Sequence, residues 1–433
     1  MSISISRPAG VRPAGWVRAA RRRRSGPFAP FANRQYRLFS IATLISGTAL
    51  SVQSLTRVWL VQEQTHSPFL VAIAAALTAL PMLLFGFLGG ALSDRYDRRL
   101  ITIAVEAASF VGAAVLAVLV VNGTAEIWHI MAFSFVHGTT AALSSPSKQT
   151  LLADLVPHRQ QRGAIGLNMV VGNLAGIAGP AIGAFLITRF GTSESMVAGA
   201  VISVVALPFY ALVGSDAPRR RARATGRVLK NLVEGVRFVV ADPTLRWLLL
   251  AGVTLLITLS SRGAVYPALV QDVLHGGAGA LGVLELVGGI GAVAGPMLAV
   301  AFTNRFPDRL VQVVSGFSFA ASVAMLAFSP WFPLTALLAG LSTFAGTLFF
   351  VTNMTAFQLS APEEYRGRVV SVRFVSWGLQ PVGTLTLGAI AEAAGPKFAL
   401  LAFAASGALL LGALVVLFRP PRPTVAPPAA ALE

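Results

Sequence analysis

The sequence predicts an all-α integral membrane protein with twelve transmembrane helices in two pseudo-symmetric halves of six. Three observations lead to this fold class. Of the 433 residues, 55% are hydrophobic and only 12% are charged, whereas soluble domains carry roughly 25% charged residues. Apolar runs of membrane-spanning length recur along nearly the whole chain. A hydrophilic stretch at residues 214–245 separates six such runs from six more.

Each apolar run is long enough to cross a membrane. At about 1.5 Å per residue, such a helix spans a hydrocarbon core of roughly 30 Å. Ser67-Pro68 and Asp242-Pro243 each place a capping residue before a proline at the first helical position, so they mark helix starts. The predicted spans are 37–62, 68–92, 100–122, 127–147, 164–188, 194–213, 246–269, 278–302, 310–329, 332–358, 370–391 and 397–418.

The basic residues predict the orientation of these spans. If the N-terminus is cytoplasmic, 30 of the 34 Lys and Arg residues fall in segments on the cytoplasmic side, with Lys148 and Arg373 assigned to loops. Basic loops stay in the cytoplasm, so we expect a multi-pass protein of a bacterial inner membrane with both termini cytoplasmic. Topology and contact with anionic lipid explain the formal net charge of +17 better than nucleic-acid binding does.

Segments outside the two halves are expected on the cytoplasmic side. The Arg-, Pro- and Gly-rich N-terminal arm lacks the apolar run of a cleavable signal peptide, and we expect it to be disordered. Residues 228–237 have apolar residues at helical spacing with charges between them, which predicts an amphipathic helix on the membrane surface. The expected divisions are an arm, 1–36; an N-terminal bundle, 37–213; a linker, 214–245; a C-terminal bundle, 246–418; and a tail, 419–433.

The two halves show weak internal similarity. Asp94-Arg95-Tyr96 after the second span corresponds to Asn304-Arg305-Phe306 after the eighth. The loop from Pro157 to Gly163 corresponds to the loop from Pro362 to Gly367, and a Gly- and Pro-punctuated helix follows each loop. Repeated halves and broken helices suit a carrier in which two bodies rock about a site near the middle of the membrane.

A charged turn joins the second and third spans, with the sequence Gly90-Ala91-Leu92-Ser93-Asp94-Arg95-Tyr96-Asp97-Arg98-Arg99. It resembles the loop signature of the major facilitator superfamily, Gly-x-Leu-Ala-Asp-Arg-x-Gly-Arg-Lys. Asp97 stands where the signature has glycine, so we expect Asp97 to adopt the left-handed conformation.

The resemblance implies that this turn is a cytoplasmic gate. A carboxylate beside guanidiniums forms charge-assisted hydrogen bonds that can lock the two halves together in the outward-facing state. The alternative is that the arginines only set topology. The expected gate residues, with those of the corresponding loop in the second half, are Gly90, Asp94, Arg95, Arg98, Arg99, Arg366 and Arg368.

Two further loops narrow the resemblance to one branch of that superfamily. Pro362–Val369 and Leu152–Pro157 resemble the corresponding loops of enterobactin exporters and macrolide-efflux proteins. The alternative for the first loop is a solvated turn whose charges pair in water. The resemblance covers roughly residues 37–418 and implies export rather than uptake.

The fifth span carries Gly176, Gly179, Pro180 and Gly183. This set resembles the antiporter motif Gly-x-x-x-Gly-Pro-x-x-Gly, except that Ala175 replaces the first glycine. Close helix packing at small residues and a kink at proline explain the pattern equally well. We therefore expect a helix-packing motif here.

Ionisable residues inside the spans are functional candidates because burying charge in a membrane is costly. The resemblance implies that the first, fourth, seventh and tenth spans line the cavity while the third, sixth, ninth and twelfth face lipid. Glu106, on the third span, is therefore given less weight. The expected residues of the substrate and proton cavity are Gln53, Arg57, His137, Arg262, Glu285 and Gln380.

Glu285 is expected to pair with Arg262, and its protonation is expected to be one coupling step. The alternatives are a static Arg262–Glu285 ion pair and a packed, neutral His137. The charges of Arg57 and Arg262 together favour an anionic or hydrogen-bonding ligand.

Other chemistry is missing from the sequence. There is no cysteine, no phosphate-binding Gly-x-x-x-x-Gly-Lys-Ser/Thr and no Gly-x-Ser-x-Gly, so we expect no enzyme activity, cofactor or metal. The sequence therefore predicts a monomeric secondary transporter that exports a small, partly hydrophobic molecule in exchange for protons. That molecule is expected to be a drug, siderophore or secondary metabolite. Alternatives are a lipid or lysolipid flippase on the same fold, and a non-transporting sensor or scaffold.

Overall fold

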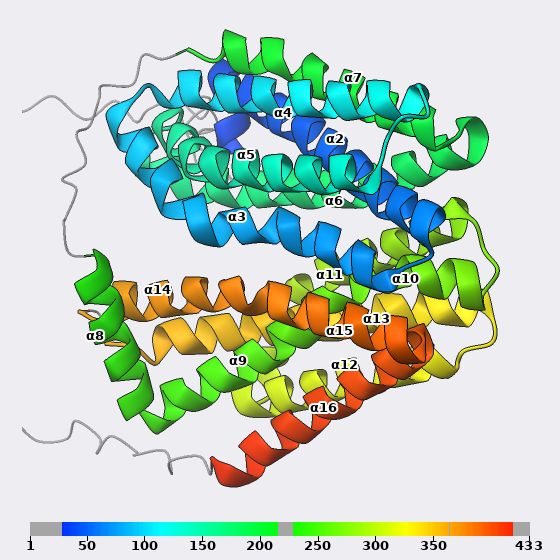
Figure 1. Ribbon diagram of the computed structural model, residues 1–433. Coiled ribbons are helices and arrows are strands. Elements are labelled where there is room, and N and C mark those ends of the chain that lie inside the picture. The colour runs from blue at the N-terminus through cyan, green and yellow to red at the C-terminus, as the bar shows by residue number, and fades with distance from the viewer. Residues whose placement is uncertain (1–27, 215–227, 363, 419–433) are drawn as a thin grey trace, which may run out of the picture.

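The computed structural model describes residues 28–214, 228–362 and 364–418, and within these ranges every regular element is a helix (Figure 1). The first group of long helices, called the N-half here, forms the upper part of Figure 1. It consists of η1 (Ala29–Ala32), α2 (Arg34–Thr65), α3 (Pro68–Arg95), α4 (Arg98–Val121), α5 (Ile127–Asp154), η2 (His158–Gln160), α6 (Gln161–Phe190) and α7 (Thr192–Leu212).

The second group of long helices, called the C-half, forms the lower part of Figure 1. It consists of α9 (Pro243–Ser261), η3 (Arg262–Ala264), α10 (Tyr266–Ala268), η4 (Leu269–Val273), α11 (Ala278–Arg305), α12 (Asp308–Phe328), α13 (Phe332–Leu359), α14 (Arg366–Ser376), η5 (Trp377–Leu379), α15 (Gln380–Ala394) and α16 (Pro396–Leu417). Helix α8 (Val228–Ala241) precedes it. A helix is thus found at each of the twelve predicted spans and at the predicted amphipathic segment.

Among the described residues, ten helices are long and apolar enough to cross a membrane by length and composition. The two spans outside this set are α5, which is rich in hydroxyl side chains, and the α14–α15 segment, which the turn η5 interrupts. The predicted span 127–147 stops just before Lys148, which lies inside α5. The predicted span 370–391 contains Arg373, but this residue was counted with the preceding loop; it lies inside α14.

The capping residues act as predicted. The Ser67 hydroxyl accepts a hydrogen bond from the Leu70 amide at 3.2 Å, and the Asp242 carboxylate accepts one from the Leu245 amide at 2.8 Å. These bonds satisfy amides that have no partner within the helix.

The prediction for Asp97 was wrong. Its φ is −65° and its ψ is 119°, which is extended backbone. The side chain instead caps α4 by accepting a hydrogen bond from the Arg99 amide at 2.8 Å. A capping carboxylate therefore forms this turn, and the left-handed conformation of glycine is not needed.

The two halves touch at the right-hand end of Figure 1. A Cβ atom on Gly388 of α15 would lie 2.3 Å from the Ala72 Cβ of α3, and one on Gly282 of α11 would lie 2.0 Å from the Ala184 Cβ of α6. Toward the other end, a Cβ on Gly90 or Gly166 would meet no atom within 4 Å. The halves are therefore packed at one end and separated at the other.

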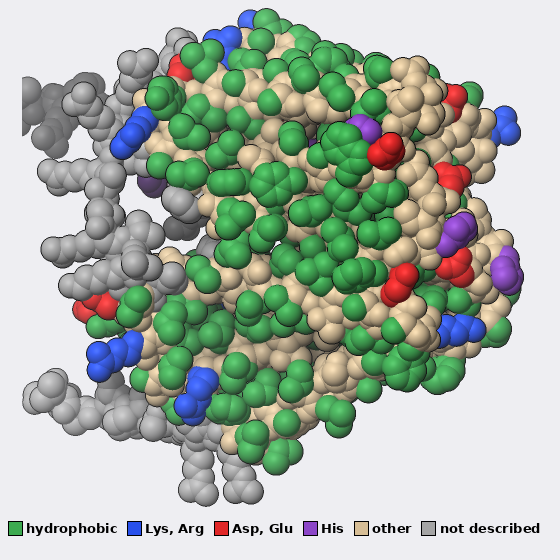
Figure 2. Space-filling view, in the orientation of Figure 1, with side chains coloured by type: hydrophobic (Ala, Val, Ile, Leu, Met, Phe, Trp, Pro, Cys, Tyr) green, Lys and Arg blue, Asp and Glu red, His purple; other side chains and the backbone are tan. Residues whose placement is uncertain are grey.

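Side-chain chemistry differs between these two ends. Figure 2 shows hydrophobic side chains across the middle of this face, with more Lys and Arg at the left and more acidic and His side chains at the right. The separated end is therefore the more basic one.

Candidate functional site

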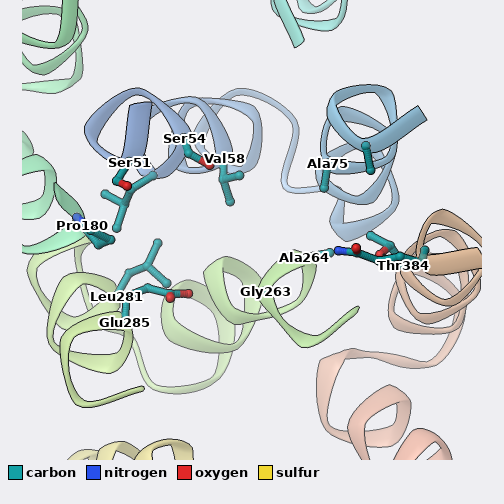
Figure 3. A pocket seen from close by; sticks show the side chains of 13 residues that line it. Ser51, Ser54, Val58, Ala75, Pro180, Gly263, Ala264, Leu281, Glu285 and Thr384 are labelled. Carbon is teal, nitrogen blue, oxygen red and sulfur yellow. The ribbon is translucent and has the colours of Figure 1, made fainter. Parts of the chain in front are cut away.

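A cavity of about 270 Å³ lies between the two halves and is called the interface cavity (Figure 3). Both halves contribute to it, because α2, α3 and α6 lie on one side and η3, α11 and α15 on the other. Its lining residues are Ser51, Ser54, Leu55, Val58, Ala75, Ala79, Pro180, Gly263, Ala264, Leu281, Glu285, Gln380 and Thr384.

Glu285 gives the interface cavity its charge. It is the one ionisable side chain among these lining residues, beside three hydroxyls and the Gln380 amide. In Figure 3 it projects from α11 into the space that separates α11 from Ser51 and Ser54 of α2. Within the described ranges, its carboxylate accepts no hydrogen bond and forms no ion pair, so it remains available to a ligand.

Arg262 does not pair with Glu285 as expected. Helix α9 ends at Ser261, and Arg262 begins the turn η3. From there its guanidinium donates to the Ser342 hydroxyl at 2.7 Å and to the Thr343 hydroxyl at 2.9 Å, both on α13. No ion pair joins the two residues in the described part of the chain, because the hydroxyls of the C-half take the guanidinium.

Arg57 likewise turns into its own half. Its side chain is only 2% exposed, donates to the Thr78 hydroxyl at 3.3 Å and lies over the Phe133 ring at 5.6 Å. His137 packs against the same ring at 5.5 Å between centroids. The two arginines expected to attract an anion are therefore absent from the lining of the interface cavity.

A second cavity, of about 240 Å³, lies inside the N-half and is called the N-half chamber. Gln53 and His137 line this chamber and not the interface cavity. The six expected cavity residues thus separate into three places. Glu285 and Gln380 line the interface cavity, Gln53, His137 and Arg57 lie in the N-half, and Arg262 lies in the C-half.

Glu106 was given too little weight. It lines the N-half chamber and forms an ion pair with Lys148, with 2.6 Å between Oε1 and Nζ. Helix α4 presents this carboxylate to α5, because one face of α4 packs on α5 and α7 and does not meet lipid. The sequence analysis did not predict this ion pair, because Lys148 was assigned to a loop and so no partner for Glu106 was expected inside the spans.

In this conformation Arg98 and Arg99 bond within the N-half, and Arg368 of the C-half bonds to the linker helix α8. Arg98 forms an ion pair with Asp154 at the end of α5, and Arg99 donates to the Ala211 carbonyl. Arg368 forms an ion pair with Glu234 of α8 at 3.1 Å. Arg95 is exposed, and Gly90 faces open space. The side chains of Asp94 and Arg366 lie outside the described part of the structure.

The fifth-span glycines bring α6 close to α2. A Cβ on Gly179 would lie 2.2 Å from the Ser51 Cβ, and one on Gly183 would lie 3.4 Å from the Val52 carbonyl oxygen. Pro180 lines the interface cavity. Gly176, one turn earlier, would meet nothing within 4 Å.

Sequence reasoning missed the polar contacts that join the halves at the closed end. The Ser67 hydroxyl of the N-half donates to the Glu392 carboxylate of the C-half at 2.8 Å. The Gln62 amide donates to the Asp272 carboxylate at 3.3 Å. Both carboxylates lie beyond the predicted spans or at their ends, where acidic residues carry no distinguishing pattern.

Arg373 was also missed. Its side chain is 1% exposed and lies over the Phe350 ring at 5.7 Å. A Cβ on Gly252 of α9 would lie 2.0 Å from its Nη1, so the guanidinium occupies a space that only glycine leaves open.

Comparisons with known families and proteins agree with this geometry. Residues 25–428 match a family described as transmembrane secretion effectors, of the major facilitator type. The chain is 27% identical over 393 residues to the multidrug efflux pump Tap of Mycolicibacterium fortuitum, covering 88% of this chain and 94% of that protein.

Two other relatives are named for other substrates. The chain is 23% identical over 366 residues to macrolide efflux protein A of Streptococcus pyogenes, covering 82% of this chain and 89% of that protein. It is 25% identical over 397 residues to the enterobactin exporter EntS of Shigella boydii, covering 88% of this chain and 91% of that one.

Solved structures share the fold at low identity. The nucleoside transporter NupG has a TM-score of 0.71 at 11% identity, covering 90% of this chain and 100% of that one. A bacterial homologue of the lysosomal transporter Spinster, in an inward-facing and unoccupied conformation, has a TM-score of 0.68 at 14% identity, covering 89% of this chain and 95% of that one.

Proposed function

Because this chain belongs to the transmembrane secretion effector family of the major facilitator superfamily, we propose that it exports a small, partly hydrophobic molecule in exchange for protons. It is a multi-pass membrane transporter, not an enzyme, and its relatives are efflux pumps. We also propose that it works as a monomer in the inner membrane.

The interface cavity carries this proposal. It lies where two separate helix bundles meet, and those bundles touch at one end and separate at the other. A site in that position is reached from one side of the membrane at a time if the halves rock against each other. In the proposed cycle, residues 37–213 and 246–418 are the moving bodies, and the separated end faces the cytoplasm.

The charge of the cavity favours a positively charged substrate over an anionic one. Glu285 contributes one carboxylate to a lining that is otherwise apolar or hydroxyl-bearing, whereas Arg57 and Arg262 are bonded elsewhere. A partly hydrophobic cation would place its charge at Glu285 and its apolar surface on residues such as Val58 and Leu281. Drug-like amines, including macrolides, fit this description.

We propose that the cytoplasmic arginines are a gate that is released in this conformation. Arg98 and Arg368 each bond to a partner on their own side of the separation, Asp154 and Glu234 respectively. Exchange of these partners for groups on the opposite half would close the cytoplasmic end. The charge-assisted bonds would then hold the outward-facing state.

Accumulation in a pump-deficient bacterial host expressing the chain tests the proposal. The compounds would be the lipophilic cation ethidium, the macrolide erythromycin and a catecholate siderophore, each with and without a protonophore. We expect reduced accumulation of ethidium or erythromycin, restored by the protonophore. Unchanged accumulation of every compound, with the protein present in the membrane, would reject proton-driven export and favour lipid flipping or uptake.

Glu285→Gln is expected to reduce ethidium export about tenfold, equivalent to about 1.4 kcal/mol. The substitution keeps the size of the side chain and removes the charge that faces the cation. The measurement is the initial efflux rate at several ethidium concentrations. Glu63→Gln is the matched control, because Glu63 is an exposed carboxylate that accepts from Thr192 away from the cavity. Equal loss in both variants would contradict a specific role for Glu285.

A further inference from the structure

The N-half chamber is a polar space inside one bundle. Helices α2, α4, α5, α6 and α7 all contribute to its lining. Hydroxyl groups dominate that lining, and the charged residues in it are Glu106 and Lys148. The hydroxyl-bearing lining residues are Thr43, Ser46, Ser51, Ser109, Thr140, Ser144 and Ser203.

The chamber is wet. Two buried atoms that belong to its lining residues, His137 Nδ1 and Gln53 Oε1, have no hydrogen-bond partner among the described residues. Buried polar atoms are satisfied by ordered water when no protein partner is present. A volume of about 240 Å³ leaves room for several waters at roughly 30 Å³ each. Hydroxyl, amide and charged side chains make up most of its lining, whereas drug-sized ligand sites are mostly apolar, so it suits water and protons better than a partly hydrophobic molecule.

The ion pair in this chamber is mostly but not fully buried. The Glu106 side chain is 14% exposed and the Lys148 side chain 23% exposed. Lys148 also lies over the Tyr210 ring at 5.5 Å, and the Tyr210 hydroxyl is 3.2 Å from the Ser46 hydroxyl. A carboxylate held against an ammonium beside water can gain and lose a proton without leaving its position.

Four groups on the helices packed around Glu106 can affect its charge. Helix α5 presents Lys148 and His137, α7 presents Tyr210, and α2 carries Arg57 farther along the bundle. In the described lining of the chamber, Glu106 is the one acidic side chain. A proton that enters the chamber therefore has a single carboxylate to bind.

The C-half carries an uncharged counterpart. If Pro157 is aligned with Pro362, Lys148 aligns with Asn353. If Asp94 is aligned with Asn304, Gln312 lies one helical turn from the position equivalent to Glu106. Asn353 donates to the Leu248 carbonyl at 3.0 Å and lies 3.4 Å from the Gln312 amide oxygen. The same helix contact is thus ionisable in the N-half and not in the C-half.

We propose that Glu106 is the binding site for the coupling proton and that Lys148 is its counterion. This inference rests on the proposed proton-coupled export and names the group that carries the proton. When hydronium enters the chamber, its proton bonds to a carboxylate oxygen of Glu106 and a neutral water remains. The ion pair then ends, and the charge of the pair rises from zero to +1. In the present conformation the pair is intact, which corresponds to the state after proton release to the cytoplasm.

The same two helices link this site to the proposed gate. Lys148 precedes Asp154 by six residues on α5, about 9 Å along the helix. Asp154 pairs with Arg98 at the start of α4, the helix that carries Glu106. Two ion pairs therefore join α4 and α5, and protonation of Glu106 removes the one that lies deeper in the membrane.

Infrared difference spectroscopy of proteoliposomes, between neutral and acidic buffer, tests the site without any substrate. We expect a carboxylic-acid C=O band in the wild type that is lost in Glu106→Gln. In Lys148→Met the same band should already be present at neutral pH, because no ammonium then stabilises the carboxylate. Identical spectra for wild type and Glu106→Gln would overturn the proposal.

Transport of ethidium against an imposed pH gradient provides the second test. The double variant Glu106→Gln/Lys148→Asn installs the kind of amide pair that the C-half already packs, so it is expected to fold. It should bind ethidium and exchange it across the membrane without a gradient, but lose about tenfold or more of the gradient-driven rate. Full gradient-driven export by this variant would overturn the proposal.

The two measurements separate this inference from the proposed function. If wild type exports no compound but its Glu106 band responds as described, the proton site stands and proton-driven export of these compounds fails. If wild type shows proton-driven export while Glu106→Gln leaves the spectrum unchanged, the assignment of Glu106 fails and the proposed function stands.

Discussion

A disulfide between the paired substitutions Thr188→Cys and Gly279→Cys is expected to stop export, and a reductant is expected to restore it. Thr188 lies in the last turn of α6 of the N-half and Gly279 in the first turn of α11 of the C-half, at the closed end. A Cβ on Gly279 would lie 3.1 Å from the Thr188 Oγ1 and 3.9 Å from its Cγ2, and two cysteines this close can meet the geometry of a disulfide. The bond would hold shut the end that must open for release.

The natural sequence contains no cysteine, so no other thiol competes. The measurement is ethidium export as a function of the cross-linked fraction, with each single substitution as a control that should retain export. Complete cross-linking with undiminished export would show that the halves do not part at this end, and the proposed rocking cycle would then be wrong.

Gly179→Ala is expected to destabilise the protein by about 1–3 kcal/mol, the usual cost of overpacking. The added methyl would lie 2.2 Å from the Ser51 Cβ and 3.0 Å from the Thr48 carbonyl oxygen. Helix α6 would have to move away from α2, which would also change the interface cavity, because Ser51 and Pro180 line it.

Gly176→Ala is the matched control for this prediction, because the same methyl group would meet nothing within 4 Å. Alanine is the better helix former, so this variant should be neutral or slightly more stable. The measurement is the unfolding temperature of detergent-purified protein, followed by tryptophan fluorescence. Equal unfolding temperatures for the two variants would show that the contact between α6 and α2 is looser than the structure indicates.

The sequence predicted the helices well because their signals are local. Apolar runs of sufficient length, with Ser67-Pro68 and Asp242-Pro243 at helix starts, are properties of neighbouring residues. The errors in the predicted helices concern basic residues, which can either mark a cytoplasmic loop or lie inside a helix. Lys148 and Arg373 were taken as topology signals, although both lie inside helices, where Arg373 is buried and Lys148 is half-buried.

The candidate site was less predictable because it depends on how each helix is rotated about its axis. Spacing places Arg57, Glu106 and Arg262 at known depths but does not say which neighbour each one faces. The structure turns Arg57 toward Thr78 and Arg262 toward Ser342, leaving Glu285 in the interface cavity. Glu106 was assigned by a rule for the whole third span, and packing of α4 on α5 overrides that rule.

The polarity of α5 has a consequence for how the protein is made. This helix is not among the ten described helices that are apolar enough to cross a membrane by themselves. A lysine within a span costs a few kcal/mol unless another group compensates it. The compensating carboxylate, Glu106, lies on α4, the helix synthesised immediately before. Integration of α5 into the bilayer during translation therefore depends on α4 being retained beside it, and the two helices should enter the lipid as a hairpin.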